Sequence, residues 1–151
     1  MNKISILFFV LVVIMAVGSS CKRNDDKTAL NITLYNQPLD KIEFYIQGKW
    51  RYVYGKGGIC GSCLHSCNNC SIEFIKGNKV KSDLFIKDNT TFEVEWKKEI
   101  GYFTRDSTFV MMLYNKGGYS GSYFIDKIYN DTLIIHDYGS DPIFHHFVKW
   151  K

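Results

Sequence analysis

The sequence is poor in proline and contains no block of like charges. Its 151 residues include only two prolines, and its formal net charge of +4 comes from lysines and arginines interspersed with acids. Proline-rich and strongly charged compositions are typical of disordered chains, and clustered basic residues are typical of nucleic-acid-binding proteins. We therefore expect a folded chain with no nucleic-acid partner. After residue 17 the sequence also lacks a long apolar run, so we do not expect a protein that crosses a membrane with several helices.

The residue patterns that carry common enzyme chemistry are missing as well. The sequence offers no Ser/His/Asp order, no paired carboxylates in an apolar setting and no glycine-rich phosphate loop. These are the arrangements that supply nucleophiles, proton transfer and phosphate binding. The sequence therefore predicts a non-enzymatic protein with no catalytic residue and no cofactor.

The first 20 residues have the layout of a secretory signal. Lys3 gives a positive start, Ile4–Val17 is almost entirely apolar, and Gly18-Ser19-Ser20 supplies small residues for cleavage. The apolar stretch is too short to span a bilayer comfortably. Charge, apolar run and small residues in this order predict a cleavable signal peptide over residues 1–20.

A cysteine follows the small residues directly. Gly-Ser-Ser-Cys at 18–21 resembles the lipobox of bacterial lipoproteins, in the looser form found in the Bacteroidota. This resemblance implies that Cys21 becomes the lipidated first residue, followed by a flexible tether that we place at 21–38. Several acyl chains at about 0.8 kcal/mol per buried CH₂ hold a protein on a membrane. We expect lipid anchoring in a bacterial outer membrane, facing the periplasm or the cell surface. The alternative is a plain secretory signal with Cys21 free or disulfide-bonded.

The remaining 131 residues (151 − 20) are rich in patterns of short strands. Aromatics make up 16% of the chain, which favours strands. Trp50, Tyr52 and Tyr54 alternate with Arg51 and Val53, and the cleanest period-two pattern places Phe92, Val94 and Trp96 opposite charged residues. Further extended segments are predicted at 72–76, 108–114, 119–128, 133–138 and 143–150. Seven to nine short strands indicate an all-β antiparallel sandwich or barrel.

The segment ahead of the first strand has a different period. Leu39, Ile42 and Ile46 follow Pro38 at helical spacing, so a short helix is predicted before Gly48. A helix followed by Gly48-Lys49-Trp50 and an up-and-down series of strands resembles the lipocalin-like domains of small Bacteroidota lipoproteins. The resemblance covers residues 39–151. It implies an antiparallel up-and-down barrel of about eight strands with a short N-terminal helix, in which Trp50 closes the narrow end.

Four cysteines occur within the eleven residues between the first two strands, at positions 60, 63, 67 and 70. In an exported domain, an even number of cysteines predicts disulfides. Adjacent pairing (Cys60–Cys63 with Cys67–Cys70) and nested pairing (Cys60–Cys70 with Cys63–Cys67) are both sterically accessible, and the sequence does not choose between them. Two Cys-x₂-Cys pairs also match zinc or redox chemistry. The short spacing between the pairs disfavours zinc, so we predict no metal.

The function predicted from these features is binding in the cell envelope. The barrel mouth, shaped by the disulfide loop, is expected to hold an apolar small molecule or a protein partner. The candidate cavity-lining residues are aromatic: Trp50, Tyr52, Tyr54, Phe92 and Trp96. These side chains equally suit a packed core. A second hypothesis is an inhibitor or immunity factor that acts through surface loops. A turn about residues 139–142 would also place His136 opposite His145, as a site for metal or protons.

Overall fold

The structure is a computed structural model that describes residues 28–84, 90–101 and 105–151. The predicted signal peptide, 1–20, and Cys21 lie outside the described residues. The described elements occur in the order β1 (Ile32–Thr33), α2 (Leu39–Ile46), β2 (Gly48–Gly57), β3 (Leu64–His65), β4 (Ser71–Ile75), β5 (Lys79–Ser82), β6 (Thr90–Ile100), β7 (Ser107–Asn115), β8 (Gly118–Tyr129), β9 (Thr132–Asp137) and β10 (Ile143–Lys149).

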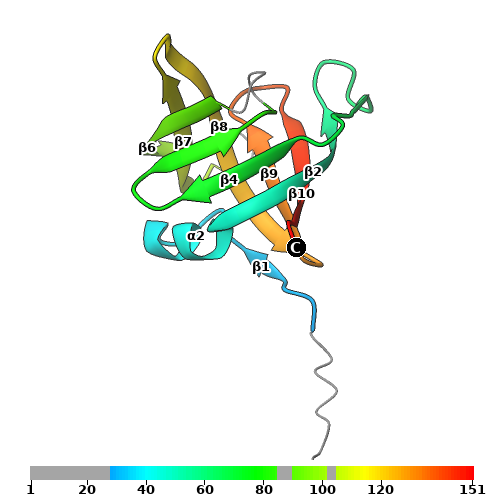
Figure 1. Ribbon diagram of the computed structural model, residues 1–151, viewed down its shortest axis with the longest axis horizontal. Helices are drawn as coiled ribbons and strands as arrows, with labels where there is room; N and C mark the ends of the chain where they lie inside the picture. The colour runs from blue at the N-terminus through cyan, green and yellow to red at the C-terminus, as the bar shows by residue number, and fades with distance from the viewer. Residues whose placement is uncertain (1–27, 85–89, 102–104) are drawn as a thin grey trace, which may run out of the picture.

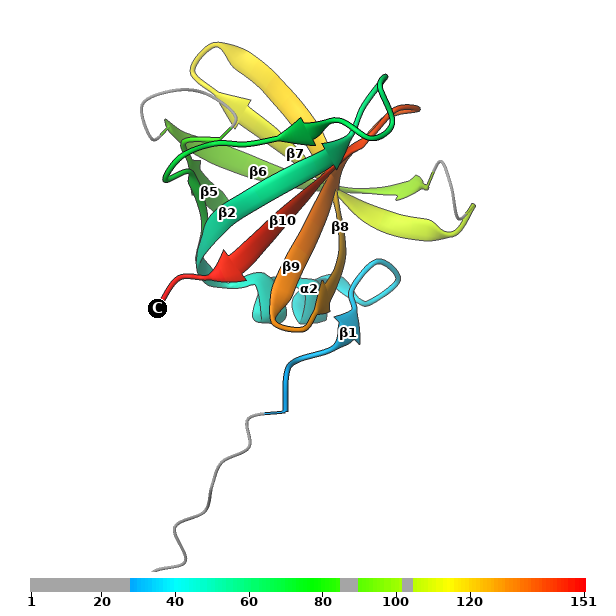
Figure 2. The same cartoon turned by 90° about the vertical axis from the view of Figure 1, so that its right-hand side faces the viewer.

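Eight of the strands form a closed barrel. They pair in the order β2-β4-β5-β6-β7-β8-β9-β10, each antiparallel to the next, and β10 pairs back to β2. Figures 1 and 2 show this ring from two directions. The short strands β1 and β3 are additions to it, on β8 and β2 respectively. The all-β, up-and-down barrel with about eight strands and one short helix, as the lipocalin-like resemblance implied, is confirmed.

Helix α2 covers one end of the barrel (Figure 1). Pro38 precedes its first turn, and the three-to-four spacing of apolar residues directs Ile42 and Ile46 inward, where they are 1% and 2% exposed. The predicted helix before Gly48 is therefore confirmed. It has eight residues, and the described part of the chain contains no helix that is long and apolar enough to cross a membrane.

Trp50 joins this helix to the barrel. Its indole Nε1–H donates a hydrogen bond of 2.6 Å to the carbonyl oxygen of Ile46, and the side chain is only 3% exposed. The Lys149 ammonium lies 4.2 Å from the centre of the indole ring. Trp50 thus closes the barrel end that α2 covers, which is the packing role that the lipocalin-like pattern implied.

Alternation along the strands fills the barrel interior. In β6, Phe92 and Val94 are buried while Glu93 and Glu95 face solvent, as predicted from the sequence. The inward residues of the strands join the helix in one apolar cluster, which contains Leu34, Ile42, Ile46, Trp50, Tyr52, Cys70, Ile72, Phe74, Val80, Phe92, Val94, Met111, Leu113, Ile125, Ile128, Leu133, Ile135 and Phe147. Side chains therefore occupy the part of the barrel nearest α2.

The packed structure begins earlier than the sequence indicated. In β1, Ile32 pairs with Ile128 of β8. The first residue after β1, Leu34, is completely buried. The Thr108 hydroxyl donates a hydrogen bond to the carbonyl oxygen of Tyr35. The predicted tether, 21–38, is therefore too long, because its last residues pack against the barrel ahead of Leu39.

Candidate functional site at the barrel mouth

The end of the barrel opposite α2 contains a cavity of about 410 Å³. β2, β8, β9 and β10 supply its wall, and the segment between β2 and β4 contributes His65, Ser66 and Cys67 to the lining. The cavity is lined by Tyr52, His65, Ser66, Cys67, Leu84, Tyr123, Asp137, Ile143 and His145. Hydroxyl, imidazole and carboxylate groups therefore share this space with apolar side chains, a composition typical of small-molecule sites.

A histidine and an aspartate are hydrogen-bonded inside the mouth. His145 Nε2 lies 3.0 Å from Asp137 Oδ1, and the His145 side chain is buried. The other oxygen of Asp137 accepts a hydrogen bond of 3.3 Å from the backbone N–H of Ile143, across the β9–β10 turn. The backbone bond fixes the carboxylate, which in turn fixes the imidazole ring. The pair is a pre-organised polar group at the cavity wall.

Two tyrosines complete the polar wall. The Tyr52 hydroxyl donates a hydrogen bond of 3.3 Å to the carbonyl oxygen of His65, and its ring centre lies 6.0 Å from that of His145. Burial, and then the negative charge of Asp137, raise the pKa of Tyr52. Burial raises the pKa of Tyr123 strongly, and Asp137 raises it further. Because these phenols keep their protons at neutral pH, they are able to donate hydrogen bonds inside the cavity.

The four cysteines of the loop form two disulfides, Cys60–Cys63 and Cys67–Cys70. Each bond joins residues whose Cα atoms are 5.6 Å apart, within the usual range for a disulfide. The disulfide prediction is therefore confirmed in its adjacent form, and the nested pairing is not adopted. Cysteines joined in this way are not zinc ligands, and the described residues contain no group of three or more His, Cys, Asp or Glu placed to hold a metal ion.

The two disulfides occupy different environments. Cys67 lines the cavity and Cys70 is buried in the apolar cluster, with the Cys70 carbonyl accepting a hydrogen bond of 2.9 Å from the Tyr52 N–H. The Cys60–Cys63 bond instead lies in an exposed arm. β3 holds the arm against β2 through pairing of His65 with Gly55. One disulfide therefore shapes the cavity wall, and the other shapes the projecting tip.

Gly55 leaves the space in which the mouth residues meet. A Cβ atom at this position would lie 2.5 Å from the Tyr52 hydroxyl, 2.9 Å from Ile143 Cγ2 and 3.4 Å from His145 Nδ1. Real side chains do not approach this closely, so only glycine allows the three residues to converge beside β2. The absence of a side chain at Gly55 is thus a requirement of the site.

The structure separates the five predicted cavity-lining aromatics. Tyr52 lines the mouth cavity, whereas Trp50 and Phe92 are buried in the core at 3% and 0% exposure. Trp96 lines a pocket at the other end of the barrel. Tyr54 lies outside the barrel, where it is 39% exposed and its ring stacks on His146 with centres 4.2 Å apart.

The expectation that Tyr54 shares a face with Trp50 and Tyr52 is corrected by an irregularity in the sheet. Phe147 pairs with Tyr52, but the preceding residue, His146, pairs with Tyr54, so one residue of β2 is extra. A bulge of this kind shifts the alternation by one position. Tyr54 therefore turns outward and Gly55 turns inward.

The predicted pairing of His136 with His145 is also corrected. His136 pairs with Phe144, one residue away from the predicted partner. A shift of one residue moves a side chain to the opposite face of a sheet. His136 consequently lies on the outer face, with its ring 5.1 Å from that of Phe124 and 5.0 Å from that of Phe144, and burial lowers its pKa.

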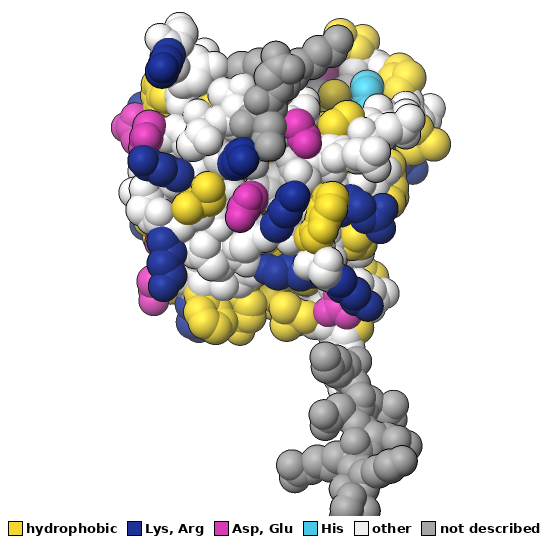
Figure 3. All heavy atoms as spheres, viewed as in Figure 1, with side chains coloured by type: hydrophobic (Ala, Val, Ile, Leu, Met, Phe, Trp, Pro, Cys, Tyr) yellow, Lys and Arg dark blue, Asp and Glu magenta, His cyan; other side chains and the backbone are white. Residues whose placement is uncertain are grey.

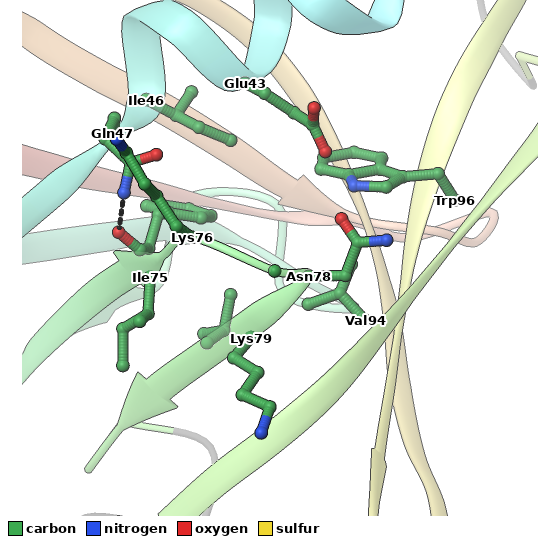
Figure 4. A pocket seen from close by; sticks show the side chains of 12 residues that line it. Glu43, Ile46, Gln47, Ile75, Lys76, Asn78, Lys79, Val94 and Trp96 are labelled. Atoms are coloured by element: carbon green, nitrogen blue, oxygen red, sulfur yellow. Dashed lines mark hydrogen bonds between the residues drawn. The ribbon is translucent and has the colours of Figure 1, made fainter.

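The pocket beside Trp96 is smaller, at about 160 Å³, and lies between α2, the β4–β5 turn and β6. Figure 4 shows the Glu43 carboxylate near the indole of Trp96, with Asn78 on the same side. The side-chain amide of Gln47 donates a hydrogen bond of 2.6 Å to the carbonyl oxygen of Phe74. This pocket therefore arises where the helix ends against the barrel.

A wider depression, of about 590 Å³, lies against the outer surface of the barrel beside Ile134, Phe144 and His146. Two of its charged residues, Asp126 and Lys127, already pair with each other at 3.5 Å. The mouth cavity, in contrast, collects a fixed His–Asp pair and two protonated phenols around one space. We therefore identify the mouth as the candidate functional site.

Two important mouth residues, Tyr123 and Asp137, were missed by the sequence analysis. Their signal was the period of the strands: Tyr123 lies two residues before buried Ile125, and Asp137 lies two residues after buried Ile135. A polar residue at the inward position near the end of an apolar strand indicates a site at the barrel opening.

In comparisons with known proteins, no family model, curated protein or solved structure matches the chain.

Proposed function

We propose that this chain is a lipid-anchored binding protein of the bacterial cell envelope, of the kind found in the Bacteroidota, with a small molecule held in the barrel mouth. The mouth cavity of about 410 Å³ carries the proposal, because protein sites for small molecules commonly measure about 300–1,000 Å³. Cys21, next to the predicted signal peptide, supports the anchor. The proposal involves binding without catalysis.

The lining of the cavity refines the chemical class of the ligand. Leu84 and Ile143 offer apolar contacts, whereas Tyr52, Tyr123 and Asp137 offer hydrogen-bond donors and an acceptor. A ligand that matches this wall is an apolar body with a polar end. The polar end would form hydrogen bonds with the phenols and the carboxylate of the cavity wall.

Native mass spectrometry of the protein extracted from its own cells tests this proposal. We expect a small-molecule adduct on the wild-type protein and a weaker adduct on the Asp137→Asn variant, which keeps the shape of the wall and removes its charge. Asp40→Asn, on the exposed face of α2, is the matched control and should retain the adduct. Complete absence of an adduct, or equal retention by Asp137→Asn, would contradict small-molecule binding at the mouth.

A second candidate function is protein recognition by the cysteine loop, as in an inhibitor or an immunity factor. Its tip exposes two apolar side chains, Ile59 at 97% and Leu64 at 72%, on either side of the Cys60–Cys63 bond. Tyr119, in the β7–β8 hairpin, is 58% exposed. A rigid apolar tip is suited to a partner pocket because little conformational entropy is lost on binding.

Affinity purification from envelope extracts distinguishes the two functions. If the loop recognises a protein, one partner should co-purify with the wild-type chain and be lost with the double variant Ile59→Asp/Leu64→Asp. Phe44→Asp, on the surface of α2, provides the matched control because it removes an equally exposed apolar residue at the other end of the molecule. Equal recovery of the partner with both variants would argue against the loop as its binding site.

A further inference from the structure

Three large aromatic side chains are exposed at the end of the barrel that α2 closes. Phe44 of α2 is 74% exposed, Tyr129 at the end of β8 is 58% exposed, and Trp150, which follows β10, is 42% exposed. Figure 3 shows hydrophobic side chains along the lower edge of the molecule, where α2 lies in Figure 1. We call these three residues, together with Lys41, Lys49 and Lys151, the base of the molecule.

Backbone contacts place the three elements at this common end. The Trp150 N–H donates a hydrogen bond of 3.0 Å to the carbonyl oxygen of Lys49, next to Trp50, whose indole bonds to α2. Val148 of β10 pairs with Thr132 of β9, and Thr132 pairs with Tyr129. The aromatics are therefore presented by one end of one closed barrel.

Lysines accompany the aromatics of the base. The Lys49 ammonium lies 4.1 Å from the centre of the Trp150 ring, and Lys41 and Lys151 are exposed nearby in the chain. Aromatic rings mixed with lysine are characteristic of protein surfaces at the membrane–water interface. Asp40 and Asp131 offset part of the positive charge, and the aromatic rings add apolar area that can be buried at a lipid surface.

The chain that precedes the barrel joins it at the base. β1 pairs with Lys127 and Ile128 near the end of β8. The Leu30 N–H donates a hydrogen bond of 2.9 Å to Asp131 Oδ1, two residues from Tyr129. Thr28, where the described chain begins, is only seven positions after Cys21 (28 − 21). Seven extended residues reach at most about 25 Å. A lipid on Cys21 would thus hold the base close to the bilayer.

We propose that the base lies on the lipid headgroups, with Phe44, Tyr129 and Trp150 at the interface. The inference rests on the proposed lipid anchor at Cys21 and adds the orientation of the domain. With the base on the membrane, the cysteine loop projects from the far end of the barrel (Figure 2), and its His65, Ser66 and Cys67 line the mouth cavity there. The site is then accessible to molecules that arrive from the aqueous side.

A pair of tyrosines on one strand gives a matched test. Tyr119 and Tyr129 are both 58% exposed and stand near opposite ends of β8, so they are separated by roughly 30 Å. The lipidated protein, carrying Tyr129→Cys or Tyr119→Cys with a nitroxide label, would be reconstituted in phosphatidylethanolamine–phosphatidylglycerol vesicles. Collision rates of the label with oxygen and with a water-soluble nickel chelate then report its depth.

We expect the label at 129 to collide several-fold more with oxygen, relative to the nickel chelate, than the label at 119. A second label at Phe44→Cys should behave like that at 129. Equal collision ratios at 119 and 129, or a higher oxygen ratio at 119, would overturn the proposed orientation. Intact mass of the same samples tests the anchor separately: a mature chain without acyl groups on Cys21 would overturn the proposed function as well as the orientation that rests on it.

Discussion

His145 and Asp137 form a 3.0 Å contact within the barrel mouth, and the same carboxylate raises the pKa of both Tyr52 and Tyr123. One acidic residue therefore contacts His145 and also acts on both tyrosines of the cavity wall. Burial is the larger cause for both tyrosines, so the protein keeps these phenols neutral above the pH at which a solvated tyrosine ionises, and the pKa of Tyr123 is raised strongly.

Alkaline pH should destabilise the wild-type protein through Tyr123. Above pH 10.0, the ordinary pKa, tyrosine ionises in the unfolded chain while Tyr123 in the folded chain keeps its proton. The unfolded state then binds fewer protons, so the free energy of unfolding falls as the pH rises beyond that value. In denaturant unfolding between pH 8 and 11, the free energy of unfolding should fall less steeply for Tyr123→Phe than for the wild type. The fall for Asp137→Asn should lie between the two. Tyr129→Phe, at an exposed tyrosine, is the control and should keep the wild-type pH dependence. If Tyr123→Phe showed that same pH dependence of the free energy of unfolding, the result would contradict this account.

Adding one methyl group at Gly55 should disturb the mouth. Gly55→Ala forces the Tyr52 hydroxyl and Ile143 to move, since a Cβ atom would come within 2.5 Å and 2.9 Å of them. Overpacking of this kind costs about 1–3 kcal/mol. Gly139→Ala is the control, because a Cβ atom there meets nothing within 4 Å. Chemical denaturation should place the control within about 0.5 kcal/mol of wild type. Equal stability of the two variants would show that the mouth accommodates the methyl group freely.

The indole of Trp50 should contribute more than its apolar area. Trp50→Phe removes the 2.6 Å hydrogen bond to Ile46 and leaves that carbonyl without its indole donor, at a cost of about 1–3 kcal/mol. Trp150→Phe is the matched control, because that ring is 42% exposed and also lies beneath a lysine. Its free energy of unfolding should change by less than about 0.5 kcal/mol. Similar losses for both variants would be evidence against a special role for the Trp50–Ile46 bond.

The two disulfides should differ in their effect on stability. Each closes a loop of the same length, so the chain-entropy contribution of each is about 2 kcal/mol. Only Cys70 also lies in the core, at 6% exposure, and Cys67 lines the cavity. The double variant Cys67→Ser/Cys70→Ser should therefore unfold at lower denaturant than Cys60→Ser/Cys63→Ser. Mass spectrometry without reductant checks the pairing first, and a Cys60–Cys70 linked peptide would contradict it.

The parts of the fold that repeat a local rule were predictable from the sequence. The spacing of Ile42 and Ile46 predicted the helix, and the alternation of Phe92 and Val94 predicted a half-buried strand. In a helix, residues three or four apart face the core, and in a strand every second residue does. The spacing of apolar residues therefore predicts the element. The resemblance carried by Gly48 and Trp50 then led from separate strands to a barrel.

The candidate site was less predictable because it depends on register. Tyr54 was placed inward by a strict period of two, but the extra residue in β2 opposite the His146–Phe147 step reverses the alternation beyond Tyr52. The predicted partner of His136 was wrong by one residue because the type and length of a turn together fix the register of a hairpin, and the residues at 139–142 did not define them. The pairing of four closely spaced cysteines likewise depends on three-dimensional distances that the spacing alone leaves open.

The pairing of β2 with β10 has a consequence for how the protein folds. Every other contact in the ring joins strands that are neighbours in the sequence, whereas this one brings Trp50 opposite Lys149. The ring therefore cannot close until β10 has been synthesised, and closure of a contact this distant is slow compared with hairpin formation. Until then, a nascent chain of this topology is an open sheet in which one edge of β2 is unpaired.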